Sequence, residues 1–362
     1  VLFRSYLYDS RSPTPLLESI HMPSWIYPDT VTPDGLKAKY QAKTLRILLV
    51  PGHDNEYGGT EFKGLREADL NLRLAEKLAQ FLAQDEHFQV ITARDFQTGN
   101  YVGDIETYFN EKREDINGFR RELRNNFNQL VSAGQVTVPG EQVHHNFAPQ
   151  EVALRLYGMN KWANEHQIDL MIHVHFNDYP RAQRRGSGQY SGFAIYVPEK
   201  QYPNGAASID LAKTVSQYLG RALAVSDLPI ENAGVVEDQE LIAVGAQASR
   251  EGASMLIEYG YIYESPWHYP ETKEAMLEEL AWQTYRGVKG YFAPEVVADE
   301  TLLLPYLLTV EMGAGLRGRR DVLALQKALQ RAGLYPPTGK TMNDCPINGN
   351  FGPCVRAAVL VF

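Results

Sequence analysis

Three apolar segments of this chain each end in a side chain that can bind a metal ion or transfer a proton. The three side chains are His53 directly after residues 45–50, His175 at the end of residues 169–175, and Glu258 near the end of residues 254–259. Imidazole nitrogens and carboxylate oxygens are the usual ligands of a catalytic zinc ion, which keeps one position open for water. These residue types therefore predict a Zn2+ site and a hydrolase.

Hydrolysis at such a site uses a metal and a separate proton carrier. Zinc lowers the pKa of its bound water to about 7 and polarises a bound carbonyl group. A second carboxylate, held off the metal, can take the proton from that water and pass it to the leaving nitrogen. Glu258 interrupts an otherwise apolar segment, where a carboxylate is costly to bury unless it has a function or a partner. We therefore expect Glu258 to be the catalytic residue.

Each assignment has an ordinary structural alternative. His53 could cap a turn in PGHDN, and Glu67 could be a solvated residue in the first turn of a helix, where the helix dipole favours a carboxylate. His173 and His175 lie on the same face of one predicted strand, at positions i and i+2. Since His175 is nearer the end of that strand, we expect it to bind the metal, and His173 is the alternative ligand.

The order of the predicted elements indicates an α/β fold. Strands are predicted at 45–50, 88–95, 169–175, 192–198 and 254–259, and helices at 70–82, 150–166, 208–223, 238–250 and 271–290. Alternating strands and helices are typical of a mostly parallel twisted sheet flanked by helices. Ligands gather beyond the carboxyl ends of the strands in such sheets, so the three strand-end side chains are expected to meet at one edge. Glu67 is expected in the first turn of the helix after the first strand, where the chain returns to this edge.

The chain is expected to contain more than this sheet. Residues 1–44 are predicted to be an extended lead-in, and 45–290 the catalytic domain. Within that domain, the polar residues 96–149 are predicted to be an insertion with some helix, in which His144 and His145 are exposed. A linker at 291–311 precedes a small all-α domain at 312–362.

The bulk properties exclude some classes of partner. The 362 residues are 44% hydrophobic and 22% charged, which is ordinary for a soluble globular protein. A formal net charge of -9, without a basic stripe, argues against a nucleic-acid partner. No apolar run approaches the roughly 18 residues needed to cross a membrane. We expect both ends, Val1 and Phe362, to be truncations, so a signal peptide could have preceded this sequence.

The strand-end fragments resemble a known family. VPGHDNEYGGTEFKGLREADLN resembles the opening of the zinc-dependent N-acetylmuramoyl-L-alanine amidases, which is Asp-Pro-Gly-His-Gly-Gly followed by Glu-x-Asp-x-x-Leu. DLMIHVHFND is similar to their Ser-Ile-His-Ala-Asn strand, and ASMLIEYGYI to their Val-Glu-x-Gly-Phe strand. This resemblance implies that His53, Glu67 and His175 are the zinc ligands. It also implies that Glu258 is the catalytic glutamate.

The chain departs from the family pattern at several positions. Val50 stands where the family has Asp, Asp54 replaces the first Gly after the histidine, and His173 replaces Ser. Residues 96–149 form a longer insertion than is usual. An inserted helical segment in this family can cover the site until a partner displaces it, so a regulatory partner for 96–149 is a further hypothesis.

The C-terminal part resembles a different module. Residues 316–335 and 347–362 are similar to the small helical peptidoglycan-binding repeat, with DVLALQ and GNFG as the shared marks. Asn348 and Val355 stand where the repeat has Asp and Thr. We expect this module to be incomplete at its C-terminal end.

Two cysteines, Cys345 and Cys354, lie near the C-terminus. They could be free thiols, or they could pair around a small loop, which would favour an oxidising compartment.

Together these features predict a peptidoglycan hydrolase that acts outside the cytoplasm, as a secreted, periplasmic or wall-associated protein. Its zinc site would hydrolyse the amide bond between N-acetylmuramic acid and L-alanine. Two alternatives stay open. The metal site could serve a peptidase or an amidohydrolase of another amide, because a fold does not determine its substrate. The protein could also bind the cell wall without catalysis.

Overall fold

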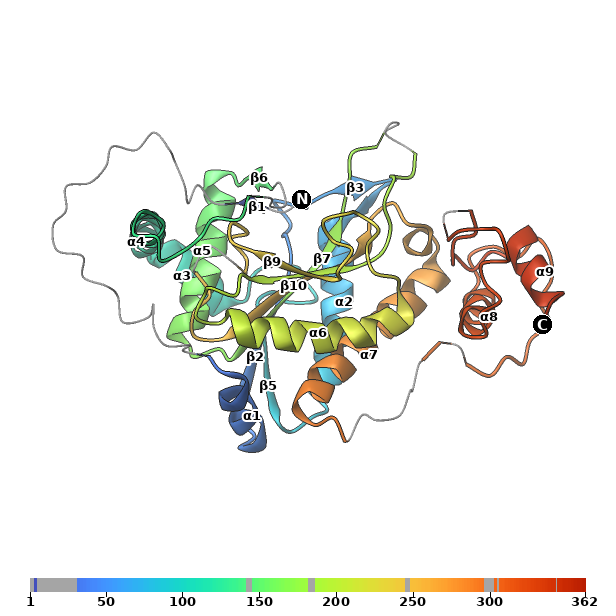
Figure 1. The fold of residues 1–362 in the computed structure, drawn as a ribbon, viewed down its shortest axis with the longest axis horizontal. Coiled ribbons are helices and arrows are strands. Elements are labelled where there is room, and N and C mark those ends of the chain that lie inside the picture. The colour runs from blue at the N-terminus through green and yellow to red at the C-terminus, as the bar shows by residue number, and fades with distance from the viewer. Residues whose placement is uncertain are drawn as a thin grey trace.

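The computed structural model describes residues 3–4, 31–140, 145–181, 186–244, 248–295, 303–304, 306–342 and 344–362. In these residues, six strands form one sheet in the order β5-β2-β7-β10-β8-β9 (Figure 1). Its strands are β2 (Leu45–Pro51), β5 (Phe88–Thr92), β7 (Leu170–Asn177), β8 (Ala194–Pro198), β9 (Val235–Asp238) and β10 (Ala253–Tyr261). Only the β8–β10 pair within the sheet is antiparallel. The predicted mostly parallel sheet flanked by helices is confirmed.

The central strands are apolar on both faces, because helices cover both faces. On one face, Ile47 and Leu49 of β2 share a core with α2 (Glu67–Leu82), α6 (Gly205–Ala222) and α7 (Pro270–Phe292). On the other face, Leu48 and Val50 share a core with α3 (Gly103–Glu111), α4 (Arg113–Ser132) and α5 (Gln150–Glu165). Side chains of β2 therefore alternate between two cores.

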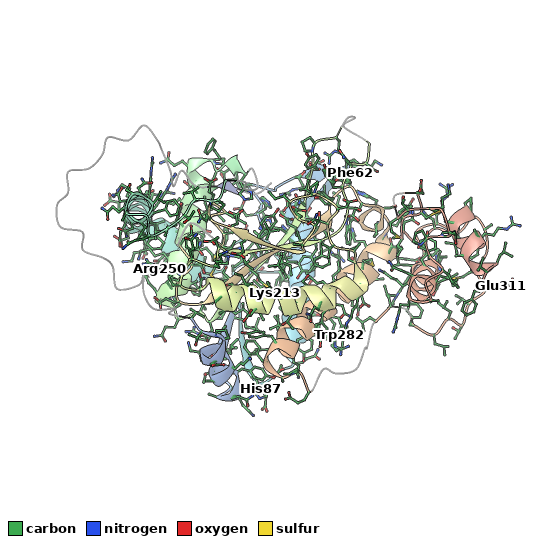
Figure 2. All side chains as sticks on the ribbon, viewed as in Figure 1. Phe62, His87, Lys213, Arg250, Trp282 and Glu311 are labelled. Carbon is green, nitrogen blue, oxygen red and sulfur yellow. A yellow bond between two sulfur atoms is a disulfide. The ribbon has the colours of Figure 1, made fainter. Side chains whose placement is uncertain are left out.

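Residues 96–149 contain the helix that was expected of them, as α3 and α4. These two helices pack on α5, where Gly158 is in close contact with Phe109 and Ile116. Arg250, which is labelled in Figure 2, packs against α4, and its guanidinium lies 5.2 Å from the ring centroid of Phe119.

Two expectations about secondary structure were wrong. The lead-in contains a helix, α1 (Pro33–Gln41), whose first turn is capped by the Thr32 hydroxyl. The region 238–250 is not helical in its described residues. Strand β9 ends at Asp238, whose Oδ1 accepts hydrogen bonds from the backbone amides of Glu240 and Leu241 and so starts a turn. The segment that follows is buried against the sheet instead of forming a helix.

Smaller elements complete the α/β part. A hairpin of β3 (Glu61–Phe62) and β4 (Leu65–Arg66) precedes α2, and the short helix η1 (Ser265–His268) precedes α7. Strand β1 (Phe3–Arg4) pairs with β6 (Asn146–Phe147). No helix in the described residues is long and apolar enough to cross a membrane.

The C-terminal residues form α8 (Arg320–Arg331), which packs on α7, and α9 (Pro353–Val359), which packs on α8 at one end of the molecule (Figure 1). A disulfide joins Cys345 to Cys354. Leu323 and Ala324 of α8 belong to the same core as the α/β part. The C-terminal helices are therefore docked on the α/β part in this structure, and the domain boundaries stay a prediction.

Candidate metal centre

Three side chains from distant parts of the sequence meet at the carboxyl edge of the sheet. His53, Glu67 and His175 each offer a ligand atom, and these atoms all lie within 4.8 Å of one another. Glu67 Oε1 lies 3.0 Å from His53 Nε2 and 3.0 Å from His175 Nδ1. The predicted convergence of these residues is thus found. We call these three candidate metal ligands the metal cluster.

The donor atoms of the metal cluster fit a shared cation. Nε2 of His53 is buried and makes no hydrogen bond within the described chain, although Glu67 Oε1 is 3.0 Å away. His53 Nε2 and His175 Nδ1 thus lie near the same oxygen of Glu67, and only His175 has the geometry of a hydrogen bond to it. Two imidazole nitrogens and a carboxylate oxygen are a donor set expected of zinc.

Local backbone structure places each member of the metal cluster. His53 follows the end of β2 by two residues and has φ +62°, in the left-handed region, and its Nε2 lies 3.0 Å from Glu67 Oε1. Glu67 is the first residue of α2, and its Oε2 accepts a hydrogen bond from the backbone amide of Thr60 at 3.0 Å. This bond fixes the carboxylate between the two rings.

Burial and mutual contact set the protonation states of the metal cluster. Burial alone would raise the pKa of Glu67, but the charge of His53 and the hydrogen bond with His175 lower it well below its usual range. Burial lowers the pKa of His175 to about 4, against the opposing effect of Glu67. An ionised carboxylate and a neutral imidazole are the forms that bind a metal.

Glu258 lies beside the metal cluster but outside it. Its backbone pairs with that of His175 across β10 and β7. The side chain is 1% exposed, and neither carboxylate oxygen has a hydrogen-bond partner in the described part of the chain. Burial, followed by the charge of Glu67, raises the pKa of Glu258 well above its usual range. Such a carboxyl group can carry a proton near neutral pH.

His173 does not join the metal cluster and instead lines a pocket next to it. The pocket has a cavity volume of about 60 Å³. Besides His173, its lining includes residues on or next to the strands and residues on α5. The former include Val50, Leu241, Ala243 and Leu256, and the latter are Val152, Arg155, Leu156 and Met159. His53 and His175 of the metal cluster also line it. We call this cavity the His173 pocket. Burial, helped by His175, lowers the pKa of His173 to about 3, so its ring is neutral.

Two residues that sequence reasoning did not assign hold the loop that carries His53. Asp54 Oδ1 accepts hydrogen bonds from the backbone amides of Glu56 and Tyr57, at 2.9 and 2.6 Å. Arg155 of α5 donates to Asp54 Oδ2 at 2.6 Å and to Glu56 at 2.9 Å. Asp54 was noticed only as a departure from the family pattern, and Arg155 lies in a helix with no local signal.

The insertion does not cover the metal cluster with its described residues. Among those of 96–149, Tyr101 alone lines the His173 pocket, whereas α3 and α4 pack on α5. His145 was expected to be exposed, but it is 7% exposed and bonds to Asp238 at 2.6 Å. His144 lies outside the described residues. A partner that acts on this insertion stays a prediction.

Comparison with known proteins gives one family match. Residues 143–290 match the model of a family described as N-acetylmuramoyl-L-alanine amidase. The match includes His175 and Glu258, whereas His53 and Glu67 precede it. A search of the curated proteins finds no match.

Solved structures with a similar fold include several amidases. The N-acetylmuramoyl-L-alanine amidase of Clostridium difficile 630 is 18% identical, with coverage of 71% of this chain and 98% of that chain at a TM-score of 0.39. The CwlD amidase of Clostridioides difficile, solved with the GerS lipoprotein, is 16% identical, with coverage of 69% and 99% and a TM-score of 0.43. The amidase Ami1 of Mycobacterium abscessus is 13% identical, with coverage of 69% and 99% and a TM-score of 0.43.

Proposed function

We propose that this protein is a zinc-dependent peptidoglycan hydrolase, which cleaves the amide bond between N-acetylmuramic acid and L-alanine. The observation that carries this proposal is the metal cluster beside a buried Glu258 whose carboxylate has no hydrogen-bond partner among the described residues. The amidase family match over 143–290 supports the substrate class.

The proposed chemistry divides between the metal and the protein. Zinc, when bound by the metal cluster, supplies a Lewis acid that polarises the amide carbonyl and lowers the pKa of water. Glu258 accepts the proton of the attacking water at a carboxylate oxygen and delivers it to the departing amine nitrogen. Burial raises the pKa of Glu258, which favours the protonated form that delivers a proton to the departing amine. Its burial also keeps bulk water from competing for the proton.

Digestion of purified peptidoglycan, with and without a chelator, tests the proposal. Mass spectrometry should detect free stem peptides that begin with L-alanine, and the chelator should abolish them. Glu258→Gln should keep its bound zinc and lose activity by a factor of about 100 to 10,000. Loss of a terminal stem residue would instead indicate a carboxypeptidase. Sedimentation with cell walls, without zinc or products, would indicate a binding protein.

We also propose that residues 312–362 bind the cell wall and that the protein acts outside the cytoplasm. The Cys345–Cys354 disulfide supports this location, because disulfides persist in oxidising compartments. A groove between the start of this region and α9 is lined by Leu316, Phe351 and Arg356, among others. Arg356→Glu should weaken sedimentation of the full chain with cell walls while hydrolysis of soluble muropeptides is unchanged. Equal sedimentation of both proteins would contradict the wall-binding role of this groove.

A further inference from the structure

The His173 pocket is a built cavity that the proposed chemistry does not use. It lies next to the metal cluster, since both imidazoles of the cluster line it. Its aliphatic lining includes Leu156 and Met159 on α5 together with Leu241 and Leu256. A cavity of about 60 Å³ is larger than a single water molecule requires, and a short side chain can enter it.

His173 presents a buried ring nitrogen without a partner to this cavity. The residue is 1% exposed and lines the cavity, and its Nε2 has no hydrogen-bond partner among the described residues. A ring nitrogen either accepts or donates a hydrogen bond, and a hydroxyl group can be the partner in both cases. Because a buried polar atom without a partner costs free energy, a hydroxyl group in the pocket would be favoured.

The spacing along β7 matches the dimensions of a substrate. His173 and His175 lie two residues apart on one face, which is about 6.6 Å along a strand. The hydroxyl oxygen of a serine lies roughly 3–4 Å from the carbonyl carbon of the preceding residue. A hydrogen bond of about 2.8 Å extends this reach to about 6–7 Å. A carbonyl held at the metal cluster would therefore place such a hydroxyl within reach of His173 Nε2.

We propose that the His173 pocket binds the side chain of the residue after the scissile amide, and that His173 makes the enzyme prefer a hydroxyl-bearing residue such as L-serine there. This inference rests on the proposed function, because the metal cluster must hold the scissile carbonyl. A methyl group cannot make a hydrogen bond and would leave Nε2 without a partner. His173 is thus a specificity residue.

Three muramoyl dipeptides test the proposal. They carry L-alanine, L-2-aminobutyrate or L-serine as the first residue, and 2-aminobutyrate has a methyl group where serine has its hydroxyl. The zinc-loaded enzyme should cleave the serine compound with a kcat/KM at least about 10-fold above that of the 2-aminobutyrate compound. His173→Leu should abolish this preference while retaining bound zinc and cleavage of the alanine compound. His173→Gln, which keeps a hydrogen-bonding side chain, should retain part of it.

A variant of the pocket wall is the matched control. Leu241→Val changes the cavity but not His173, so its serine preference should equal that of the wild type. An equal serine preference in wild type and His173→Leu would overturn the proposal. If the wild type cleaves none of the three compounds, the proposed function fails by itself. Calorimetry then measures the binding of the serine and 2-aminobutyrate compounds to Glu258→Gln. Tighter binding of the serine compound supports the proposed preference of the pocket, and equal or absent binding overturns that preference.

Discussion

Arg155 on α5 donates a hydrogen bond of 2.6 Å to Asp54, the residue that directly follows the metal-cluster residue His53. The arginine side chain is 19% exposed and the aspartate 8% exposed. The same guanidinium lies over the rings of Tyr57 and Tyr101. Because His53 has a positive φ that a histidine rarely adopts, the loop needs an external support, and this ion pair provides it.

We predict that Arg155→Gln weakens zinc binding about 10- to 100-fold, which is typical when a group that supports a metal ligand is lost. The loop would be free to relax from the conformation that directs His53 into the metal cluster. Competition with a chromogenic chelator measures the affinity. Arg113→Gln is the control, because Arg113 also pairs with a carboxylate, Glu151, but on the exposed surface. Equal affinities of the two variants would contradict a supporting role for Arg155.

A second prediction concerns the space beside His175. A Cβ atom on Gly52 would lie 2.2 Å from Nε2 of the His175 ring, which is closer than atoms can approach. The ring is buried on β7, so Gly52→Ala must displace it from the metal cluster. We expect loss of bound zinc by elemental analysis. Gly103→Ala is the control, since nothing lies within 4 Å of its added Cβ. Full zinc occupancy in Gly52→Ala would show that the ring can shift without leaving the metal.

The meeting of His53 with His175 was predictable because it follows from topology. His53 follows the end of β2 and His175 lies near the end of β7, and central parallel strands place their carboxyl ends at one edge of a sheet. Glu67 followed in the same way, since it begins the helix that leaves that edge. The roles of these residues as metal ligands stay a prediction.

Features that depend on tertiary packing could not be predicted. His145 lies in a polar stretch, yet it is buried because Asp238, far along the sequence, offers it a carboxylate. Helix-forming residues after Asp238 suggested a helix there, but the contacts of that segment with the sheet outweigh its local propensity. In contrast, the start of α1 could have been predicted from the sequence, since Thr32 followed by Pro33 is a typical helix start.

The disulfide gives a third prediction. Cys345 and Cys354 are nine residues apart, and closing so short a loop stabilises a fold by about 2–3 kcal/mol. The double variant Cys345→Ser/Cys354→Ser should therefore show faster hydrogen exchange in α8 and α9, with zinc content unchanged. Mass spectrometry of peptic fragments localises the effect. Unchanged exchange in both helices would mean that their docking on α7, rather than the disulfide, limits local unfolding.

The fourth prediction concerns a buried lysine where α8 meets α6. Lys327 is 5% exposed, and its Nζ donates to the backbone carbonyl of Ala222. Burial lowers the pKa of Lys327 from 10.5 to about 8, and Glu279 opposes this shift. Between these pH values the unfolded chain binds a proton that the folded chain does not, so stability rises with pH. Below about pH 8 both states are protonated and the penalty of the buried charge is constant.

Urea unfolding of wild type and Lys327→Met measures this dependence. From about pH 8 to about pH 10, the wild type should gain stability relative to Lys327→Met by about 1.4 kcal/mol for each pH unit. Lys340→Met, which removes an exposed lysine from the same region, is the control for the loss of one lysine. A difference between Lys327→Met and wild type that stays constant over this range would mean that Lys327 keeps its charge in the folded protein. The contact of α8 with α6 would then open to water, and α8 and α9 would not be firmly docked.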